Sequence, residues 1–188
     1  MQWLRDGLNL ISSTQDSEQI SNSHSDSNPD SAVIVVPAFA GLGTPYWDMD
    51  ARGAVLGLTR DSDANAIIRA TLESLAYQSM DVLKAMQEDS GISLFTLQVD
   101  GGASANNYLM QFQADLLGIS LERPKSVEST ALGVALMASV TMGEKVLAEL
   151  KCTREADRIF YPEKPVEWRI NKTELWKDAI KRVRTNAV

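Results

Sequence analysis

The sequence predicts an α/β fold, and three observations lead to this prediction. A continuous β-branched run, AVIVVP at 32–37, is typical of a strand that is covered on both faces. Residues 66–89 repeat apolar side chains along one helical stripe, and Gly91 ends the pattern. Between 95 and 143, strand-like and helix-like segments then alternate, which indicates parallel crossover units.

Length and composition narrow the class of protein. A chain of 188 residues corresponds to one domain, and 44% hydrophobic with 23% charged residues exclude disordered, collagenous and coiled-coil classes. The net charge of −7 repels phosphate backbones, so we expect a small-molecule partner and no nucleic acid. Cys152 is the only cysteine, and no apolar run has membrane-spanning length. We therefore expect a cytoplasmic protein with no membrane partner.

The N-terminal part predicts a short helix followed by a loop. Residues 1–11 carry apolar side chains at helical spacing with no capping residue ahead of them, so the chain reads as if it begins inside a longer element. Residues 12–31 hold eight serines and one bulky aliphatic side chain, which predicts a polar, solvent-facing loop. His24 lies in that loop without a partner to orient it, and we expect no catalytic role for it.

The remaining elements follow from apolar runs and their breaks. We expect strands at 54–58, 95–99 and 119–122, and helices over 108–118, 129–143 and 173–184. Tyr46 and Trp47 occur in a long glycine-containing connection, where they either anchor the loop, the favoured interpretation, or stack on a ligand. Glu73 on the long helix is expected to face water, with a paired carboxylate as the alternative.

The segment Asp100–Asn106, DGGASAN, is the candidate site. Gly101 and Gly102 lack a Cβ, which lets the backbone approach a ligand closely. The helix that follows offers unpaired N–H groups and a positive dipole end, which suit a phosphate. Asn106, about a turn into that helix, has an amide that can reach a base or ribose. A tight turn with no ligand explains the segment equally well, because Gly-Gly is common at strand ends.

Other chemistries find no support in the sequence. One histidine and one cysteine exclude a zinc site in practice, and there is no Gly-x-Ser-x-Gly nucleophile elbow. The glycine turn is neither a Walker loop nor the spaced fingerprint of dinucleotide folds. We therefore name no catalytic and no metal-binding residue.

Several long motifs, in order, resemble the C-terminal half of the FGGY carbohydrate kinases, most closely their glycerol kinase branch. They are VVPAFAGLGTPYWDMDARGAVLGLTR, IIRATLESLAYQSMDVLKAMQEDSGI, LQVDGGASANNYLMQFQADLLGI and ESTALGVALMASVTMG, and QWLRDGLNLI resembles the segment before them. The resemblance implies a ribonuclease-H-like C-terminal domain of the actin, hexokinase and heat-shock chaperone ATPase superfamily. Residues 1–188 would then form a single nucleotide-binding domain.

The resemblance also implies roles for individual residues. Gly102 would contact ADP through its backbone and Asn106 through its side chain, Gln2 would lie near the nucleotide, and Gly101 would permit the turn. ATP or ADP would bind with Mg²⁺, held mostly by the nucleotide and an N-terminal domain. Glycerol contacts and the catalytic aspartate would belong to that absent domain, so the chain alone is expected to be inactive. Without that domain, the surface that would pack against it is uncovered. Exposed apolar patches favour association, so we expect a homo-oligomer.

Two departures from the family pattern leave open which branch of the FGGY kinases the chain resembles most. Ala66 stands where the family usually has a polar residue, often histidine, so Asp63 or Asn65 would cap the long helix. Around Gly143 the chain is shorter than its bacterial counterparts. Another FGGY kinase, such as a pentulose kinase, is one alternative, against which only the PYWD stretch argues. A non-catalytic nucleotide-binding or interaction module is the other.

Overall fold

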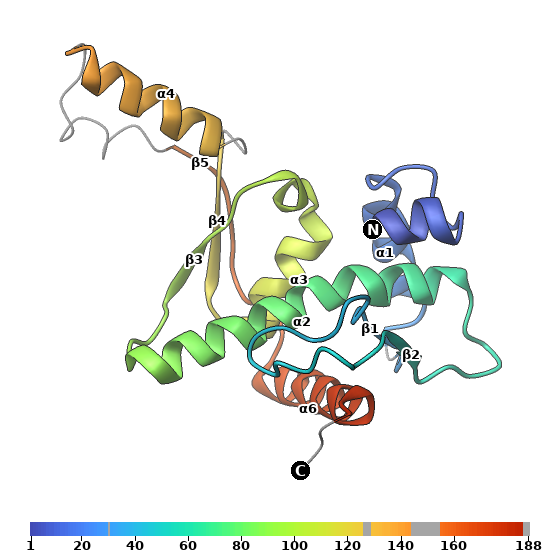
Figure 1. Ribbon diagram of the computed structural model, residues 1–188. Coiled ribbons are helices and arrows are strands. Elements are labelled where there is room, and N and C mark those ends of the chain that lie inside the picture. The colour runs from blue at the N-terminus through green and yellow to red at the C-terminus, as the bar shows by residue number, and fades with distance from the viewer. Residues whose placement is uncertain (30, 126–128, 144–154, 186–188) are drawn as a thin grey trace.

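A long helix, α2 (Ala64–Ser90), spans the space between two small sheets (Figure 1). The computed structural model describes residues 1–29, 31–125, 129–143 and 155–185. In the first sheet β1 (Ile34–Val36) and β2 (Ala54–Leu56) pair antiparallel. In the second, β3 (Thr96–Gln98) pairs parallel with β4 (Ser120–Pro124), and β4 pairs antiparallel with β5 (Ala156–Phe160). The predicted mixed α/β class and one parallel crossover are confirmed.

The strand predicted at 32–37 is the most buried strand of the fold's first sheet. All three residues of β1 are buried, with α2 against it and α6 (Val166–Val183) also in contact. Ala66 lies in the same region, packed with Val33, Val35 and Ala70. An apolar residue at position 66 therefore fits this packing, where a polar side chain would lose its hydration.

Helix α2 begins and ends at clear capping residues. Asp63 Oδ1 accepts a 2.8 Å hydrogen bond from the backbone N–H of Ala66, which selects Asp63 over Asn65 as the cap. Gly91 ends the helix with φ +68°, a left-handed conformation that glycine adopts without strain. The helix thus runs from two residues before the predicted start to one residue beyond the predicted end.

The loop predicted over 12–31 is wrong, because residues Asp16–Ser27 form helix α1. Asp16 receives hydrogen bonds from the backbone N–H groups of Ser12 and Ser13 just ahead of the helix. Ser17, Ser21 and His24 lie on one face at spacings of four and three and are buried. Small hydroxyl side chains let α1 pack closely on α2, so tertiary contact overrides the weak local preference for helix.

His24 and Glu73 both lie in buried polar contacts, contrary to expectation. His24 Nδ1 is 3.4 Å from Arg69 Nη1, so the histidine has a partner after all. Glu73 is only 4% exposed, and Glu73 Oε1 accepts 2.6 Å hydrogen bonds from Arg69 Nε and from the Tyr108 hydroxyl. Arg69 Nη1 also donates to the carbonyl of Asn28 at 2.8 Å. This buried ion-pair network joins α1, α2 and α3 (Asn107–Leu117).

Helix α6 packs against β1 and α3 and covers another side of the core. It begins seven residues before the predicted start, and its Trp176 stacks on Tyr77 with ring centroids 5.0 Å apart. Trp176 Nε1 and the Tyr46 hydroxyl both donate to Asp81 Oδ2, at 2.6 and 2.8 Å. Tyr46 therefore anchors its loop as predicted, whereas Trp47 is 73% exposed and does not.

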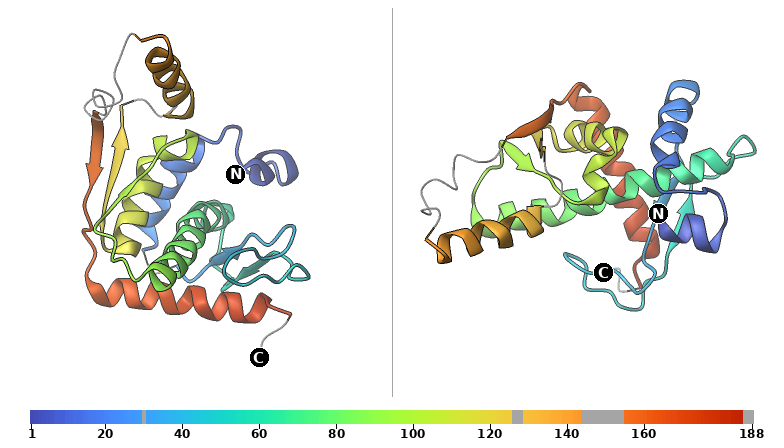
Figure 2. Two further views of the ribbon diagram at one scale, coloured as in Figure 1. Left: turned by 60° about the vertical axis from the view of Figure 1, so that its left-hand side comes forward. Right: turned by 90° about the horizontal axis from the view of Figure 1, so that it is seen from above.

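The predicted opening helix is a short π-helical turn, η1 (Trp3–Gly7), whose Leu4 packs with Ile11 and Ile68. The predicted helices α3 and α4 (Ser129–Thr141) are confirmed. No described residue of α4 is buried, and α4 extends away from the body at one end of the three-stranded sheet (Figure 2). Strand β5 was not expected. Cys152 lies outside the described residues. Within the described ranges, no helix is long and apolar enough to span a membrane.

Replacement of the buried carboxylate tests the network. Glu73→Gln leaves the Arg69 guanidinium without its counter-charge, so we expect the free energy of unfolding to fall by about 3 kcal/mol in urea denaturation. The matched control is Glu174→Gln, which breaks an exposed pair with Lys177 and is expected to cost less than about 1 kcal/mol. Equal losses in the two variants would contradict the assignment.

A second test concerns pH. Burial raises the pKa of the Asp81 carboxyl. The hydrogen bonds from Trp176 and Tyr46 lower this pKa, but burial has the larger effect. The folded state then binds the proton more readily than the unfolded state, so stability falls as pH rises from about 4, the unfolded pKa, through the folded pKa. Asp81→Asn removes this fall and keeps an oxygen for both donors. Its stability relative to the parent should increase with pH across that range.

Urea denaturation at a series of pH values measures this difference. The control is Asp178→Asn, an exposed carboxylate on α6 paired with Arg182, for which we expect a small effect. A difference between Asp81→Asn and the parent that does not change with pH would contradict the role assigned to burial.

Candidate functional site

The candidate site forms where β3 ends and α3 begins. Gly101 has φ +81° and ψ 172°, a conformation that strongly favours glycine, and it turns the chain away from the strand. Residues Gly102–Ala105 make a single 3-10 turn, η2. Both the backbone N–H and the hydroxyl of Ser104 donate to the Gly101 carbonyl, at 3.0 and 2.7 Å. The turn is thus fixed by its own hydrogen bonds.

Gly102 is exposed, and nothing in the described chain requires a glycine there. Its φ is not left-handed, and a Cβ added to it would have no atom within 4 Å. At Gly41, by contrast, an added Cβ would lie 2.6 Å from the Cα of Met49. The open space above the Gly102 backbone is therefore available to a ligand, and a side chain at position 102 would fill it.

Asn106 is the N-cap of α3, whereas we expected it about a turn into the helix. Its Oδ1 accepts a 2.9 Å hydrogen bond from the backbone N–H of Leu109. Its Nδ2 donates to Ser17 Oγ of α1 at 3.3 Å. An amide nitrogen carries two hydrogens, so one donor position remains for a ligand in addition to this contact.

Gly102 and Asn106 line the same cavity, of about 310 Å³, between the turn, α1 and α2. This volume is within the range of small-ligand sites. Leu72, Leu75 and Leu109 give the cavity apolar walls. Its polar side comes from the start of α1, with Thr14, Gln15, Ser17 and Glu18. These four residues were not predicted from the sequence. Polar side chains that recur at helical spacing are the signal that could have identified them.

Gln2 does not line this cavity. It is exposed at the start of η1. Its neighbour Met1 does form part of the wall. The structure therefore brings Gly102 and Asn106 together, with Gly101 supporting the turn, and places Gln2 next to the cavity wall. The binding roles of all four residues stay predictions.

Arg123 of β4 supports the turn from behind, and sequence reasoning missed it as well. Its Nη1 donates to the carbonyl of Ser104 at 2.9 Å and to Asn107 Oδ1 at 3.2 Å. Its Nη2 pairs with Asp157 of β5 at 2.7 Å. This mostly buried guanidinium holds the turn against the sheet, because its donors connect three segments far apart in the sequence.

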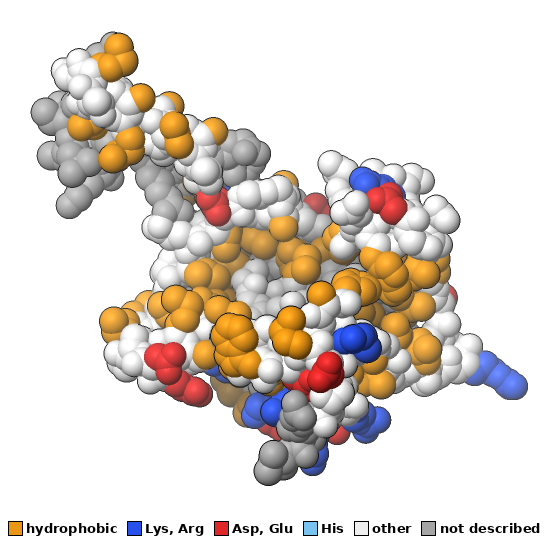
Figure 3. All heavy atoms as spheres, viewed as in Figure 1, with side chains coloured by type: hydrophobic (Ala, Val, Ile, Leu, Met, Phe, Trp, Pro, Cys, Tyr) orange, Lys and Arg blue, Asp and Glu red, His pale blue; other side chains and the backbone are white. Residues whose placement is uncertain are grey.

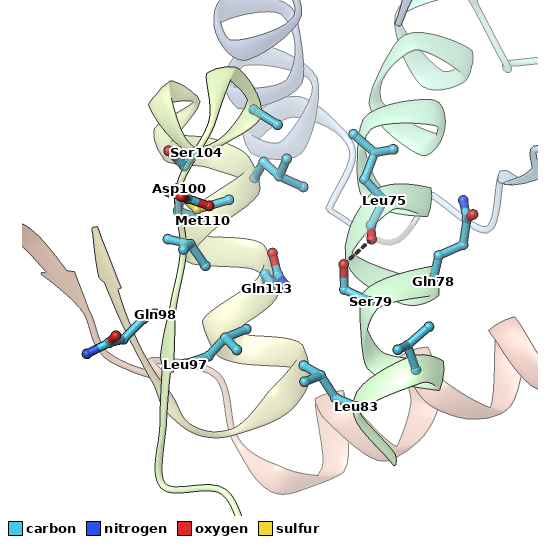
Figure 4. Close-up of a pocket in the computed structure, with 14 residues that line it drawn as sticks. Leu75, Gln78, Ser79, Leu83, Leu97, Gln98, Asp100, Ser104, Met110 and Gln113 are labelled. Carbon is cyan, nitrogen blue, oxygen red and sulfur yellow. Dashed lines mark hydrogen bonds between the residues drawn. The ribbon is translucent and has the colours of Figure 1, made fainter. Parts of the chain in front are cut away.

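A second and larger cavity, of about 630 Å³, lies on the other side of the turn, between α2, α3 and β3 (Figure 4). Leu83 from α2, Leu97 from β3 and Met110 from α3 border it, and Ser79 is hydrogen-bonded to the Leu75 carbonyl at 2.9 Å. Figure 3 shows this face hollowed in the middle, with hydrophobic side chains around the hollow. No group of three or more metal-ligating side chains occurs among the described residues.

The family model for the C-terminal domain of the FGGY carbohydrate kinases matches residues 1–142. The chain belongs to this family. It is 54% identical over 185 residues to a glycerol kinase of Fusobacterium nucleatum, covering 98% of this chain and 37% of the relative. It is 53% identical to glycerol kinases of Listeria monocytogenes and Vibrio cholerae, covering 36% and 37% of those proteins. The chain thus spans little more than a third of these relatives.

Solved structures agree with the family assignment. A Plasmodium falciparum glycerol kinase with ADP superposes with a TM-score of 0.86 at 32% identity, covering 97% of this chain and 36% of that one. A xylulose kinase of Lactobacillus acidophilus gives a TM-score of 0.74 at 20% identity and covers 96% of this chain, which shows the shared fold. The predicted C-terminal domain of the actin and hexokinase ATPase fold is confirmed.

Asn106→Asp separates the two functions of this residue. Aspartate caps a helix as well as asparagine does, so we expect α3 to persist, with a loss of stability of about 1 kcal/mol or less from the bond to Ser17. The substitution removes the Nδ2 donor, and the affinity for ADP should fall about tenfold, or about 1.4 kcal/mol, in a calorimetric titration. Unchanged affinity in a folded variant would show that Asn106 serves only as a cap.

Proposed function

We propose that these 188 residues form the adenine-nucleotide-binding half of a glycerol kinase, which converts ATP and glycerol into ADP and glycerol 3-phosphate. The cavity that Gly102 and Asn106 line together carries the proposal, because it places an uncovered glycine backbone and a side-chain amide around the same space. The identity of more than 50% to several glycerol kinases supports the choice of reaction.

The chemistry of the cavity suits an adenosine group. Adenine has two apolar faces, and Leu72, Leu75 and Leu109 offer apolar walls to them. Its polar edge, or the ribose, takes a hydrogen bond from Asn106 Nδ2. The bare backbone at Gly102 lets the ligand approach as closely as the chain allows. A relative's structure with ADP supports the same ligand class.

Phosphoryl transfer requires more than this cavity. Nucleotide, Mg²⁺ and the acceptor hydroxyl must be aligned beside a catalytic base. Among the described residues that line the cavity, Glu18 is the one carboxylate, and it already accepts a 2.8 Å hydrogen bond from Asn107. We therefore assign no catalytic or metal-binding residue to this chain. Mg²⁺ is expected to be held mostly by the nucleotide and by residues outside it, and the 188 residues alone are expected not to phosphorylate glycerol.

The identity of the substrate is the more specific part of the proposal. Glycerol is favoured over a pentulose because the matched glycerol kinases are 51–54% identical, whereas a xylulose kinase is 20% identical. A pentulose kinase and a non-catalytic nucleotide-binding module remain the two alternatives. We place the protein in the cytoplasm, where ATP is available, and expect it to form a homo-oligomer through apolar surface such as that on α4.

A calorimetric titration with Mg-ADP tests the nucleotide site. Gly102→Val fills the open space without touching another described residue, so we expect the fold to persist and ADP affinity to fall by about tenfold or more, or about 1.4 kcal/mol. Gly43→Val is the matched control, because Gly43 also has open space and no left-handed φ but lies in a different loop. It should bind ADP like the parent.

Two results would contradict the proposal. Equal ADP affinity in the parent and Gly102→Val would show that position 102 is only a turn. Glycerol-dependent release of ADP from ATP by this chain alone would show that it holds a complete active site.

A further inference from the structure

A further cavity, of about 440 Å³, lies along α3 and is separate from the two already described. One face of α3, from Asn107 through Gln111 to Asp115, lines it along its length. Helix α1 lines one side, and β5 with the start of α6 lines the other, and α3 contacts all three elements (Figure 2). None of its lining residues belongs to either of the other two cavities. We call this cavity the α3 groove.

The Arg69 guanidinium borders the α3 groove with part of its hydrogen-bonding capacity unused. Arg69 is only 5% exposed. Its Nε donates to Glu73 and Tyr108, and its Nη1 donates to the Asn28 carbonyl and contacts His24. Among the described residues, none accepts a hydrogen bond from Nη2. Because a buried donor without a partner is unfavourable, the two N–H groups on Nη2 favour an acceptor that enters from the groove.

Arg158 lines the β5 side of the groove, and its charge has no counter-ion among the described residues. The neighbouring carboxylate, Asp157, pairs with Arg123 instead. The guanidinium carbon of Arg158 is 4.5 Å from the centre of the Phe160 ring, a contact that orients the planar group. A planar guanidinium offers five N–H donors in a geometry that matches the oxygens of a carboxylate or a phosphate.

The two guanidinium groups contact the same end of α3. Arg69 Nε is 3.0 Å from the Tyr108 hydroxyl, and Arg158 Nη1 is 3.4 Å from Asn107 Oδ1. Asn107 and Tyr108 are consecutive residues in the first turn of the helix. The groove therefore has one end where an unpaired positive charge and spare N–H donors occur together.

The carboxylates that line the groove do not cancel this charge. Asp115 lies two turns further along α3, about 12 Å from Asn107 at a rise of 1.5 Å per residue. Asp115 Oδ1 already accepts hydrogen bonds from the backbone N–H groups of Glu163 and Lys164, at 2.6 and 3.2 Å. Glu163 lies at that same distant end, next to the opposite charge of Lys164. Asp26 on α1 is exposed, so solvent and salt screen its charge.

We propose that the α3 groove binds a small molecule through an oxyanion group, either a carboxylate or a phosphate. Arg158 supplies the positive charge, and Arg69, whose own charge is matched by Glu73, supplies N–H donors. The groove is larger than a bare phosphate or acetate requires, and Phe112 and Trp168 offer aromatic surface to the rest of the molecule. The proposal goes beyond the nucleotide cavity and does not rest on the proposed function.

NMR titration of the 188-residue chain with inorganic phosphate, and separately with acetate, tests the proposal. Each anion replaces chloride at constant pH and ionic strength, so general screening by salt stays the same. We expect saturating shifts of the Gln111 side-chain amide and of the Arg158 Nε–H, with a Kd of about 1–10 mM, because such small anions make few contacts. The Gly102 amide reports any binding in the candidate nucleotide cavity. Saturation by phosphate alone assigns a phosphate-bearing ligand, and saturation by acetate alone assigns a carboxylate.

A pair of arginine substitutions supplies the matched control. Arg158→Gln removes the unpaired charge from the groove, and we expect the Kd to rise about tenfold, or about 1.4 kcal/mol. Arg60→Gln changes the net charge by the same amount at an exposed arginine that lines neither the groove nor the nucleotide cavity, and it should leave the Kd unchanged. Arg158→Lys keeps the charge without the planar fork, so an intermediate Kd is expected.

A second pair of variants approaches the groove from α1. Asn22→Asp adds a negative charge to that side with little change in size, and Asn22 is exposed, so we expect the fold to persist and the Kd to rise. Asn171→Asp makes the same change at an exposed position of α6 outside the groove, and should have no effect on the Kd.

Three results would overturn the proposal. Neither anion gives a saturating shift at Gln111, or the shifts occur at Gly102 and not at Gln111, or Arg158→Gln and Arg60→Gln raise the Kd equally. The second result would place the anion in the nucleotide cavity, and the third would show unspecific attraction. Arg158→Gln should bind ADP like the parent, because Arg158 does not line the nucleotide cavity. Failure of the oxyanion proposal and failure of the nucleotide proposal are therefore distinguishable.

Discussion

The buried pair of Arg69 and Glu73 holds together the three helices on which the candidate nucleotide cavity depends. Glu73 binds Tyr108 of α3, and Arg69 reaches the end of α1 through His24 and the Asn28 carbonyl. The same three helices supply Leu72, Leu109 and Ser17 to the cavity walls. An ion pair buried this deeply stabilises little by itself, but it fixes the relative positions of its helices because an unpaired charge there is costly.

Local signals in the sequence predicted the parts of the fold that are defined locally. The strand at 32–37, the capped helix after Asp63 and the glycine turn at Gly101 were found because each follows from a short pattern of apolar or special residues. Glu73 was misjudged because exposure was assumed for a charged residue on a helix. Its burial depends on Arg69 and on Tyr108, which lies 35 residues away in the sequence, and no local pattern contains that information.

The turn that borders the candidate cavity was predicted from the sequence, but the opposite wall of the cavity was not. Gly102 and Asn106 come from one segment, so their proximity follows from the sequence. The residues contributed by α1 lie about 90 positions earlier, and only tertiary packing brings them to the turn. The two cavities share Leu75, Ala103 and Leu109. The turn that borders the smaller cavity therefore also forms part of the wall of the larger one.

The serine face of α1 has a consequence for how this segment tolerates change. Ser17 and Ser21 are almost fully buried against neighbouring helices, and their size sets how closely the helices approach. At both positions side-chain volume is constrained. The Ser17 hydroxyl also bonds to the Thr14 carbonyl and to Asn106, whereas the Ser21 hydroxyl has no hydrogen-bond partner among the described residues, so alanine fits at position 21. A branched or aromatic side chain would push α1 outward and widen the cavity that it borders. A segment with the composition of an unstructured linker thus has, through its packing, a strict limit on side-chain size.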